Sequence, residues 1–514
     1  MAAAAQEATT VGYISGDNQR DTISLLVSCF ATLGLCVYSA VHLNVPAKRE
    51  PYYEALFRQL KWCLIGLFAP ELVLYTAWRQ YASARQLCDE VEQARSKLRD
   101  RSKSATQSPR YTWTLAHGFY GTMGGIAVEI ESNRDTSPYA YIFGDAKRLT
   151  LTAKGVALLA HCGLLPDISL DEIKDKNKAD GLAKFLVCVQ AGWMMIQVIS
   201  RAAVGLPTTL LEVNTVAHVV CALLMYVVWW HKPRQVTAPT LLPADGLWPL
   251  VAYMYSASRL SGQRPDGIRG MIMHAKPELK KLAYIEGSDS NGANNNGRFV
   301  PLPQKDAIQQ EEAEIFTSED EEFQTRRQLA NEAVMQYPAI RERFKEPKNR
   351  QKDTGKAQYL LPYSTELVQP YSLNWPNAGL LRRTQSLVMG MTLWGASMVY
   401  GAIHVSAWKY FFPTYAEKLL WHLSSVWVTF CAGFWLSIHL LAYFFPVIDR
   451  IWNGFNQRRL GWFATSVIFL LCTICGVSFV GSRAYLVIEA FVSIREVPTE
   501  VYDTPNWSQV FPHL

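Results

Sequence analysis

The sequence lacks the short motifs that mark common nucleotide-dependent and hydrolytic enzymes. It contains no G-x-x-x-x-G-K-[ST] loop, no G-x-G-x-x-G turn after a strand and no G-x-S-x-G elbow. It also contains no H-x-x-H, H-E-x-x-H or D-D-x-x-D cluster, the patterns that supply zinc or magnesium–diphosphate ligands. ATP-driven transport, dinucleotide redox chemistry and hydrolysis therefore have no sequence support. We expect no cofactor, no metal and no nucleic-acid partner.

A disulfide framework is not expected either. Eight of the ten cysteines lie inside apolar blocks, where a free thiol packs as a small hydrophobic group. The C-x-x-C formed by Cys472 and Cys475 lies in one of these blocks and lacks the turn that would make a thiol accessible for redox chemistry. We interpret this pair as structural.

What the chain does have is long apolar blocks with few charges. Blocks of about twenty residues match the roughly 30 Å hydrocarbon core that a membrane helix must cross. The mean hydropathy of +0.01 is near zero because it averages these blocks with highly charged connections. We therefore expect an all-α fold, a polytopic transmembrane bundle of about seven spans. The expected spans are Thr22–His42, Leu60–Trp78, Leu182–Val204, Thr208–Trp230, Gln385–Trp408, Leu419–Phe445 and Gly461–Val480.

The connections between the blocks complete the expected organisation. Lys and Arg beside the span ends place the polar loops in the cytosol. The resulting segments are an N-terminal tail (1–21), a helical hairpin (22–78), a mixed connection (79–181), spans three and four (182–230), a cytosolic polar insertion (231–383, disordered over 286–325), spans five to seven (384–482) and an interfacial C-terminal segment (483–514). The endoplasmic reticulum is the default location.

Some connections carry more detailed expectations. In the mixed connection we expect a basic amphipathic helix that lies on the membrane surface or in solvent, then a Gly-rich buried or re-entrant segment, then a small hairpin over 139–152. A helix begins at Ser169 and runs into the third span. The alternative for 483–495 is an eighth half-span. If the C-terminus is lumenal, the sequon at Asn506 is available for glycosylation.

Ionisable residues inside the spans are the candidate catalytic groups, because a charge in lipid is costly and usually faces a cavity or a partner. Glu71 follows a proline in the second span, and Glu212 lies near the start of the fourth. A carboxyl group that stays neutral in an apolar pocket can donate a proton, so both are candidate general acids. His117, in the Gly-rich segment, is the candidate proton acceptor. The structural alternative is an ion pair between Arg201 and Glu212 across a tight turn.

Short motifs along the chain resemble a known family. They are His42-x-Asn44-x-Pro46, Ala69-Pro70-Glu71, Trp113 with His117-Gly118-Phe119, Asp180 and Lys184, Gln190 and Trp193, Arg201, Glu212, Trp230-x-Lys232-Pro233, Arg483-x-Tyr485 and Glu489-x-Phe491. In this order they resemble a family of fungal multi-pass membrane proteins that includes the membrane-bound terpene cyclase of ascofuranone biosynthesis. The resemblance implies a pocket that these residues shape: His42, Asn44, Trp113, Asp180, Lys184, Gln190, Trp193, Arg201 and Trp230.

Three functions follow as hypotheses. The first is a terpenoid or meroterpenoid cyclase of isomerase or lyase type. It would take a hydrophobic prenylated substrate from the lipid bilayer and cyclise its epoxidised chain by acid initiation. The second is a transporter or channel in which Glu71, Arg201 and Glu212 line a polar pathway, although the chain shows no internal repeat of the kind many transporters have. The third is a membrane scaffold without chemistry, which would bind its partners through the insertion.

Overall fold

The computed structural model describes residues 9–15, 20–101, 111–130, 138–177, 181–243, 246–261, 310–345, 366–374, 387–456 and 459–504, and most of them are helical. The helices are α1 (Thr22–Ala40), α2 (Tyr52–Phe68), α3 (Pro70–Arg101), α4 (Leu115–Thr122), α5 (Ala153–His161), α6 (Leu170–Asp175), α7 (Gly181–Ala203), α8 (Leu210–Val228), α9 (Trp248–Ser256), α12 (Gln310–Gln336), α13 (Pro338–Lys345), α14 (Leu387–Gly390), α15 (Ala396–Val405), α16 (Tyr415–Phe444), α17 (Pro446–Asn456) and α18 (Trp462–Val492). The strands are β1 (Thr10–Val11), β2 (Ile126–Glu129), β3 (Arg148–Leu151), β4 (Thr240–Leu242), β5 (Val368–Gln369) and β6 (Val497–Pro498).

Five described helices are long and apolar enough to cross a membrane. They are α1, the Phe185–Ala203 part of α7, α8, α16 and the segment Trp462–Arg495 that begins with α18. Each coincides with a block predicted from the sequence. The predicted span Leu60–Trp78 differs, because the chain breaks at Ala69 and α2 meets α3 at 114°. This bent pair is a sixth candidate only if it is counted as one span.

Two predicted boundaries also change. The predicted fifth span, 385–408, contains α14, a π-helical turn over Met391–Gly395 and then α15, so its described part is a distorted helix. At the other end, α18 continues without interruption to Val492 and a 3₁₀ turn follows. The prediction of a separate interfacial segment or eighth half-span from residue 483 is therefore wrong for 483–492.

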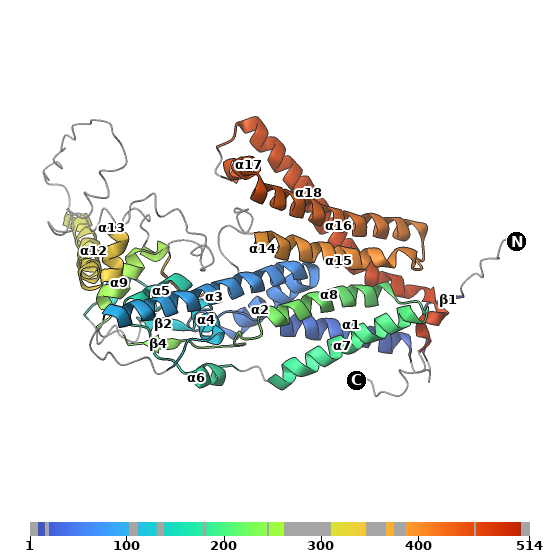
Figure 1. Ribbon diagram of the computed structural model, residues 1–514, viewed down its shortest axis with the longest axis horizontal. Coiled ribbons are helices and arrows are strands. Elements are labelled where there is room, and N and C mark those ends of the chain that lie inside the picture. The colour runs from blue at the N-terminus through green and yellow to red at the C-terminus, as the bar shows by residue number, and fades with distance from the viewer. Residues whose placement is uncertain are drawn as a thin grey trace.

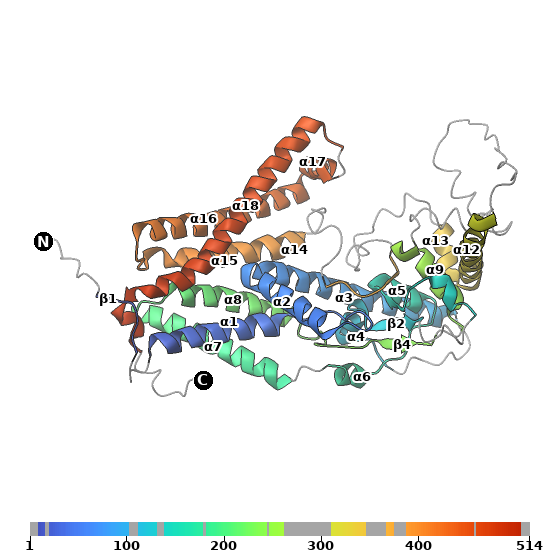
Figure 2. The same cartoon turned by 180° about the vertical axis from the view of Figure 1, so that it is seen from behind.

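The apolar helices pack side by side around α8 (Figure 1; Figure 2). Two-thirds of the apolar window of α8 is buried, whereas the corresponding window of α18 is not buried at all. α8 contacts α1, α3, α7, α15 and α18. Polar side chains on α8 are therefore enclosed by other helices, while the exposed apolar face of α18 is suited to contact with lipid.

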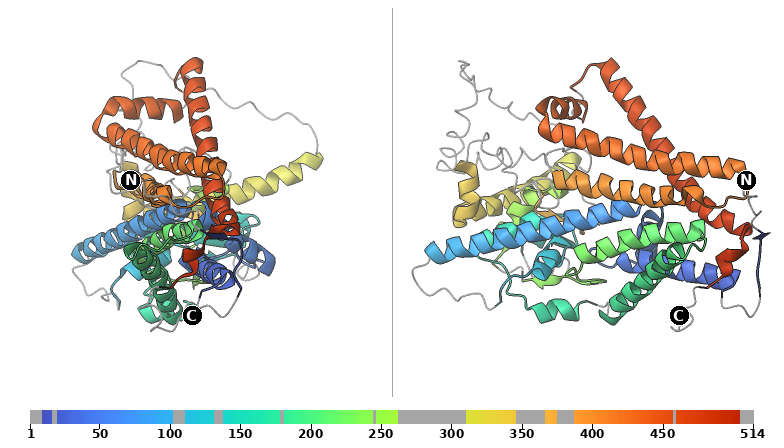
Figure 3. Two further views of the ribbon diagram at one scale, coloured as in Figure 1. Left: turned by 90° about the vertical axis from the view of Figure 1, so that its right-hand side faces the viewer. Right: turned by 45° about the vertical axis from the view of Figure 1, so that its right-hand side comes forward.

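The other end of the molecule is a second packed unit with its own hydrophobic core (Figure 3). Its sheet has the order β4-β2-β3-β5, with β2–β3 and β3–β5 antiparallel and β2–β4 parallel. Helices α5, α9 and α12 contribute to the same core. Because β4, α9, α12, α13 and β5 all come from the predicted polar insertion, much of that insertion is an integral part of this unit.

These elements correct two predictions. The fold is mainly helical but not all-α, since the mixed sheet lies in the core of the second unit. Residues 310–325, predicted to be disordered, begin helix α12, which packs on α9. The sequence Gln310–Gln336 contains no glycine or proline to interrupt a helix. Residues 286–309 lie outside the described residues.

Helix α3 connects the two units (Figure 1). Its first half contributes Val73, Leu74 and Ala77 to the bundle core, and its second half contributes Leu87 and Val91 to the core of the second unit. The apolar face of the basic stretch therefore packs against α4 and α5. Protein therefore covers the apolar face of this amphipathic helix, and its contact with the membrane surface or with solvent stays a prediction.

The connection that follows differs in detail from its prediction. The Gly-rich segment is buried as expected, but it forms α4 and β2 in the core of the second unit. The predicted hairpin over 139–152 is partly wrong, since Ala140–Phe143 is a 3₁₀ turn and the partner of β3 is β2. Ser169 caps α6 as expected, through the amide of Glu172, but α6 ends at Asp175.

The first and last described segments meet. β1 pairs antiparallel with β6, with Thr10 opposite Pro498 and Val11 opposite Val497. The amide of Thr499 also donates to the carbonyl of Thr9. The predicted N-terminal tail therefore has an ordered part that fixes it to the C-terminal segment.

Candidate functional site

The central feature of the bundle is the break between α2 and α3. Ala69 has φ −149° and ψ 64°, outside the helical region, and Pro70 begins α3. Proline has no amide hydrogen to donate and its ring prevents a straight continuation of α2. The last carbonyls of α2 therefore need partners from elsewhere, as at any helix end.

Those partners come from two distant helices. His218 Nε2, on α8, lies 2.7 Å from the carbonyl oxygen of Leu67. Arg483, on α18, donates from Nε to the carbonyl of Phe68 over 3.3 Å and from Nη2 to Oε2 of Glu71 over 2.7 Å. The Glu71 carboxylate lies in the first turn of α3, where the helix dipole favours a negative charge. The break is thus held by a buried ion pair and a buried histidine.

Further polar side chains extend this arrangement to α15. The guanidinium carbon of Arg483 lies 3.5 Å from the ring centroid of Tyr400, and the Tyr400 hydroxyl donates to Oδ1 of Asn214 over 3.0 Å. His404 Nε2 lies 3.3 Å from the same Oδ1, and its Nδ1 lies 2.8 Å from the Tyr400 carbonyl oxygen. We call Glu71, Asn214, His218, Tyr400, His404 and Arg483 the helix-break cluster. All six are buried.

Two donors of the cluster have no protein acceptor among the described residues. They are Nη1 of Arg483 and Nδ2 of Asn214, both buried. An unsatisfied buried donor costs about 1–3 kcal/mol, so such groups usually mark a bound water or a ligand with an acceptor oxygen. The cluster therefore has hydrogen-bonding capacity left for a guest molecule.

Glu212 has a different environment from the predicted one. Its Oε1 pairs with Arg20 at 2.5 Å, and its Oε2 accepts from the amide and the hydroxyl of Thr209, which closes a capping box at the start of α8. Both carboxylate oxygens are therefore committed to protein partners. The predicted Arg201–Glu212 ion pair is wrong, because Arg20 from the N-terminal segment takes that place. The geometry gives Glu212 a capping role and leaves it no oxygen for a substrate.

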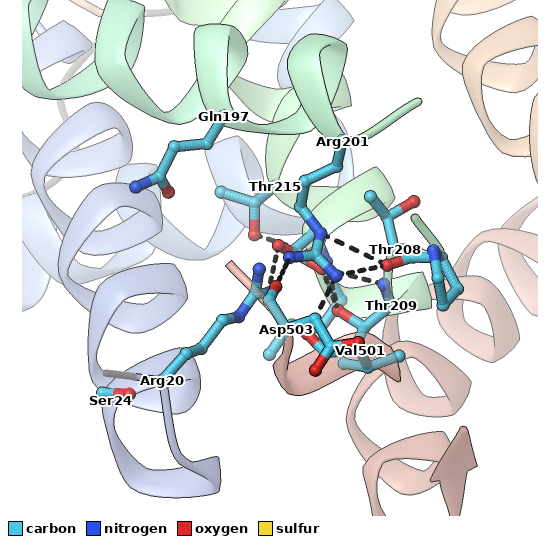
Figure 4. Close-up of polar contacts among 12 residues, drawn as sticks. Arg20, Ser24, Gln197, Arg201, Thr208, Thr209, Thr215, Val501 and Asp503 are labelled. Carbon is cyan, nitrogen blue, oxygen red and sulfur yellow. Dashed lines mark hydrogen bonds and ion pairs between the residues drawn. The ribbon is translucent and has the colours of Figure 1, made fainter. Parts of the chain in front are cut away.

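Arg201 binds only backbone oxygens (Figure 4). Its guanidinium donates to the carbonyls of Pro207, Glu500, Val501 and Asp503 over 2.6–3.2 Å. It therefore ties the end of α7 and the following turn to the C-terminal segment. This structural role explains why Arg201 is buried, and it does not require a polar transport pathway.

His117 is also committed to protein partners. Its Nδ1 accepts from the amide of Thr114, and its Nε2 donates to the carbonyl of Ile168 over 3.0 Å. Burial is the main reason that the pKa of His117 lies below its ordinary value. Its one acceptor nitrogen already has a donor, so the predicted role of His117 as proton acceptor conflicts with this geometry.

This environment makes the stability of the second unit depend on pH. Since the pKa of His117 is lower in the folded chain than in the unfolded chain, the unfolded chain takes up the proton first on acidification. The stability from neutral His117 is complete above pH 6.5 and should decline as the pH falls below that value. His117→Gln keeps a capping residue at the third helical position but does not titrate. We expect a flatter profile of thermal stability between about pH 4 and 7 for this variant. Parallel profiles would contradict the assignment.

Two of the predicted pocket residues belong to another buried network. Lys232 donates from Nζ to the carbonyl of His42 over 2.5 Å, to Oδ1 of Asn44 over 2.9 Å and to Oε1 of Gln80 over 2.6 Å. Burial lowers the pKa of Lys232. Asn44 in turn binds the segment 372–374. His42 and Asn44 therefore join the bundle to the second unit.

The remaining predicted site residues are dispersed. Trp113 packs on His117 with ring centroids 5.7 Å apart, and Gln190 donates to Thr32 over 3.1 Å between α7 and α1. Trp193 is half-buried on α7, whereas Trp230 is 61% exposed. Asp180, Asn506 and the side chain of Lys184 lie outside the described residues. The predicted pocket is therefore not assembled from these side chains.

No metal site accompanies the cluster. Among the described residues, no three histidine, cysteine, aspartate or glutamate side chains come together as metal ligands. An open pocket of about 310 Å³ lies beside β5, and its lining, Leu260, Glu366, Val368, Gln369, Pro370, Tyr371 and Leu373, includes no predicted site residue. All ten cysteines are free, as predicted.

Sequence reasoning found Glu71, but it did not single out Asn214, His218, Tyr400 or His404 as site residues. A signal was available: Asn214 with His218, and Tyr400 with His404, are each spaced by four residues in an apolar block. That spacing places both members on one helix face. Arg483 appeared only in a motif of the family resemblance, and its partner Glu71 is 412 positions away.

Comparison with protein families gives one match. A family of unknown function, DUF8562, matches residues 1–301 and 355–514. The chain belongs to this family. All six members of the helix-break cluster fall within the parts matched to DUF8562, whereas α12 and α13 of the second unit fall in the unmatched stretch between them. Comparisons with curated proteins and with solved structures give no match.

Proposed function

We propose that the protein is a multi-pass integral membrane protein, with the endoplasmic reticulum as its location. This proposal is supported by five described helices that are long and apolar enough to cross a membrane. Counting the bent pair α2–α3 and the distorted α14–α15 segment as one crossing each gives the predicted seven. The second unit, with its basic connections, is proposed to face the cytosol.

Within this frame, we infer that the protein is a transporter and that the helix-break cluster is its central site. The observation that carries this proposal is a discontinuous helix, bent by 114° inside the bundle, whose free carbonyls and first-turn carboxylate meet ionisable side chains from α8 and α18. Transporters commonly place substrate and ion sites at broken helices. Ionisable residues inside a membrane commonly mark ion or proton pathways. Glu71 was predicted to line the polar pathway and remains part of the proposed site. Arg201 and Glu212 are replaced in this role by other residues of the helix-break cluster.

Acid-initiated cyclisation is the second candidate. It is favoured by the free donor Nη1 of Arg483, which could hold the oxygen of an epoxidised prenyl chain. Both carboxylates proposed as acids already accept from an arginine, which is the reason to rank cyclisation second. A scaffold without chemistry is the remaining alternative.

One experiment separates these functions. Proteoliposomes containing the purified protein are incubated with a panel of epoxidised farnesyl-aromatic compounds and small carboxylates, and their contents and lipids are analysed by mass spectrometry. Transport is shown by unchanged compound inside the vesicles, and cyclisation by a new species of unchanged mass and different retention time. Neither result with correctly folded protein would favour a scaffold.

We expect protein-dependent uptake that falls in Tyr400→Phe, which removes the hydroxyl bonded to Asn214. Tyr485→Phe is the matched control, since it removes a hydroxyl that binds the Glu417 carbonyl outside the cluster. Equal losses in both variants would count against the cluster as the site.

A further inference from the structure

His218 is placed between two oxygens that can only accept hydrogen bonds. Its Nδ1 lies 2.8 Å from the carbonyl oxygen of Asn214, and its Nε2 lies 2.7 Å from the carbonyl oxygen of Leu67. A neutral imidazole carries one N–H, so it can donate to only one of the two carbonyls. An imidazolium carries two and can donate to both. The number of hydrogen bonds at this position therefore depends on one proton.

Of the two hydrogen bonds of His218, the one to Leu67 affects how the helices are arranged. Asn214 lies one turn before His218 on α8, so a bond to its carbonyl stays within that helix. Leu67 lies at the end of α2, beside the break at Ala69, so a bond to its carbonyl joins α8 to the break. If Nδ1 keeps the only proton, the lone pair of Nε2 faces the Leu67 oxygen at 2.7 Å, a repulsive contact. The switch therefore requires that neutral His218 keeps its proton on Nδ1, so that loss of the Nε2 proton releases the end of α2 from α8.

His404 does not have this property, although it is equally buried. Its Nδ1 faces the Tyr400 carbonyl, but its Nε2 faces the side-chain amide of Asn214. An amide can turn and present either its oxygen or its nitrogen, so a neutral His404 can be fully hydrogen-bonded. The two backbone carbonyls around His218 allow no such adjustment.

The charged and titratable groups around His218 are few. Arg483 of α18 and Glu71 of α3 form an ion pair and offset each other. Tyr400 and His404 of α15 face the ring of His218 and one another, and Cys221 follows one turn later on α8. A proton on His218 therefore adds one unit of positive charge to a cluster that is otherwise neutral.

From this geometry we infer that the proton is the coupling ion of the transport proposed above, and that His218 carries it. The inference rests on that proposed function. In each cycle one proton from the aqueous phase binds Nε2, the N–H donates to the Leu67 carbonyl and the α2–α3 break is fixed. When the proton leaves, this hydrogen bond is lost and no other bond changes. The bent pair α2–α3 is thus a hinge, and the arrangement of its two helices depends on whether one proton is bound.

The test measures the hinge directly, without a substrate. Spin-labelled amino acids are encoded at Phe57 on α2 and Arg85 on α3, both exposed, and the distance between them is measured by electron paramagnetic resonance in proteoliposomes from about pH 4 to pH 8. We expect two distance populations in the wild-type protein that exchange over about two pH units, as one proton requires. His404→Gln should retain this exchange, and His218→Gln should abolish it. His218→Met serves if His218→Gln does not fold.

Each outcome decides the inference. A single distance at every pH in the wild-type protein would overturn it, and so would an unchanged exchange in the folded His218 variant. The uptake assay keeps the two proposals separate. A pH-dependent hinge without uptake would refute transport while leaving the proton switch in place. Uptake that persists with a hinge insensitive to pH would refute the role of His218 and leave transport standing.

Discussion

Replacing Arg483 with methionine while Glu71 remains should almost eliminate the folded protein. Methionine retains much of the apolar stem that packs near Tyr400 but removes the guanidinium, which leaves the Glu71 carboxylate buried and unpaired. Removing one partner of a buried ion pair typically destabilises a protein by about 3–5 kcal/mol. The measurement is the yield of monodisperse protein and its thermal stability in detergent.

Two variants make this prediction specific. Glu71→Gln combined with Arg483→Met removes both charges, and it should recover most of the lost yield because no unpaired charge remains. Arg495→Met is the matched control on the same part of the chain, since Arg495 forms an exposed ion pair with Glu417 and should be dispensable. If the double variant is as poorly folded as Arg483→Met alone, the buried pair is not the cause.

The second large effect is expected at Arg201. Arg201→Gln leaves four carbonyl oxygens with at most the two N–H donors of one amide, in place of the five hydrogen bonds that the guanidinium makes. With about 1–3 kcal/mol for each buried group left unsatisfied, the total loss should reach about 3 kcal/mol or more. The C-terminal segment should detach, so limited proteolysis should cut between residues 493 and 504 in the variant and spare the wild-type protein.

Arg201→Lys should rescue this defect only in part, because an ammonium cannot match the planar fork of donors that reaches both the α7–α8 turn and the C-terminal segment. Ser200→Ala, the adjacent position, removes a hydrogen bond within α7 alone and should behave like the wild type. Full rescue by lysine would mean that charge, and not the oriented hydrogen bonds of the guanidinium, holds the segment.

Sequence reasoning located the apolar helices well because a membrane helix is recorded locally, in about twenty consecutive residues. α1, α7, α8 and α16 begin and end within a few residues of their predicted blocks. Pro70 indicated that the helix in the second block breaks, but the angle of 114° between α2 and α3 depends on what α2 packs against. The sheet was harder to see. β2 and β3 are buried almost throughout, so they lack the alternation of apolar and polar residues that identifies a strand with one exposed face.

Sequence reasoning indicated which charged side chains are buried, but not which groups they pair with. Glu71, Glu212 and Arg201 are all buried, as their positions in apolar blocks indicated. Their partners are Arg483, Arg20 and the backbone around residues 500–503, which only the folded bundle brings near. A single sequence records which side chains are costly to bury. It does not record which distant group satisfies them.

The pairing of β1 with β6 has a consequence for biosynthesis. A ribosome adds residues from the N-terminus, so α7 and its Arg201 are made long before residues 497–503. Arg483, the partner of Glu71, is likewise made more than four hundred residues after it. Until then Glu71 and Arg201 lack the partners that they have in the folded chain. The pairing of β1 with β6 can therefore form only after the helices between them have been made.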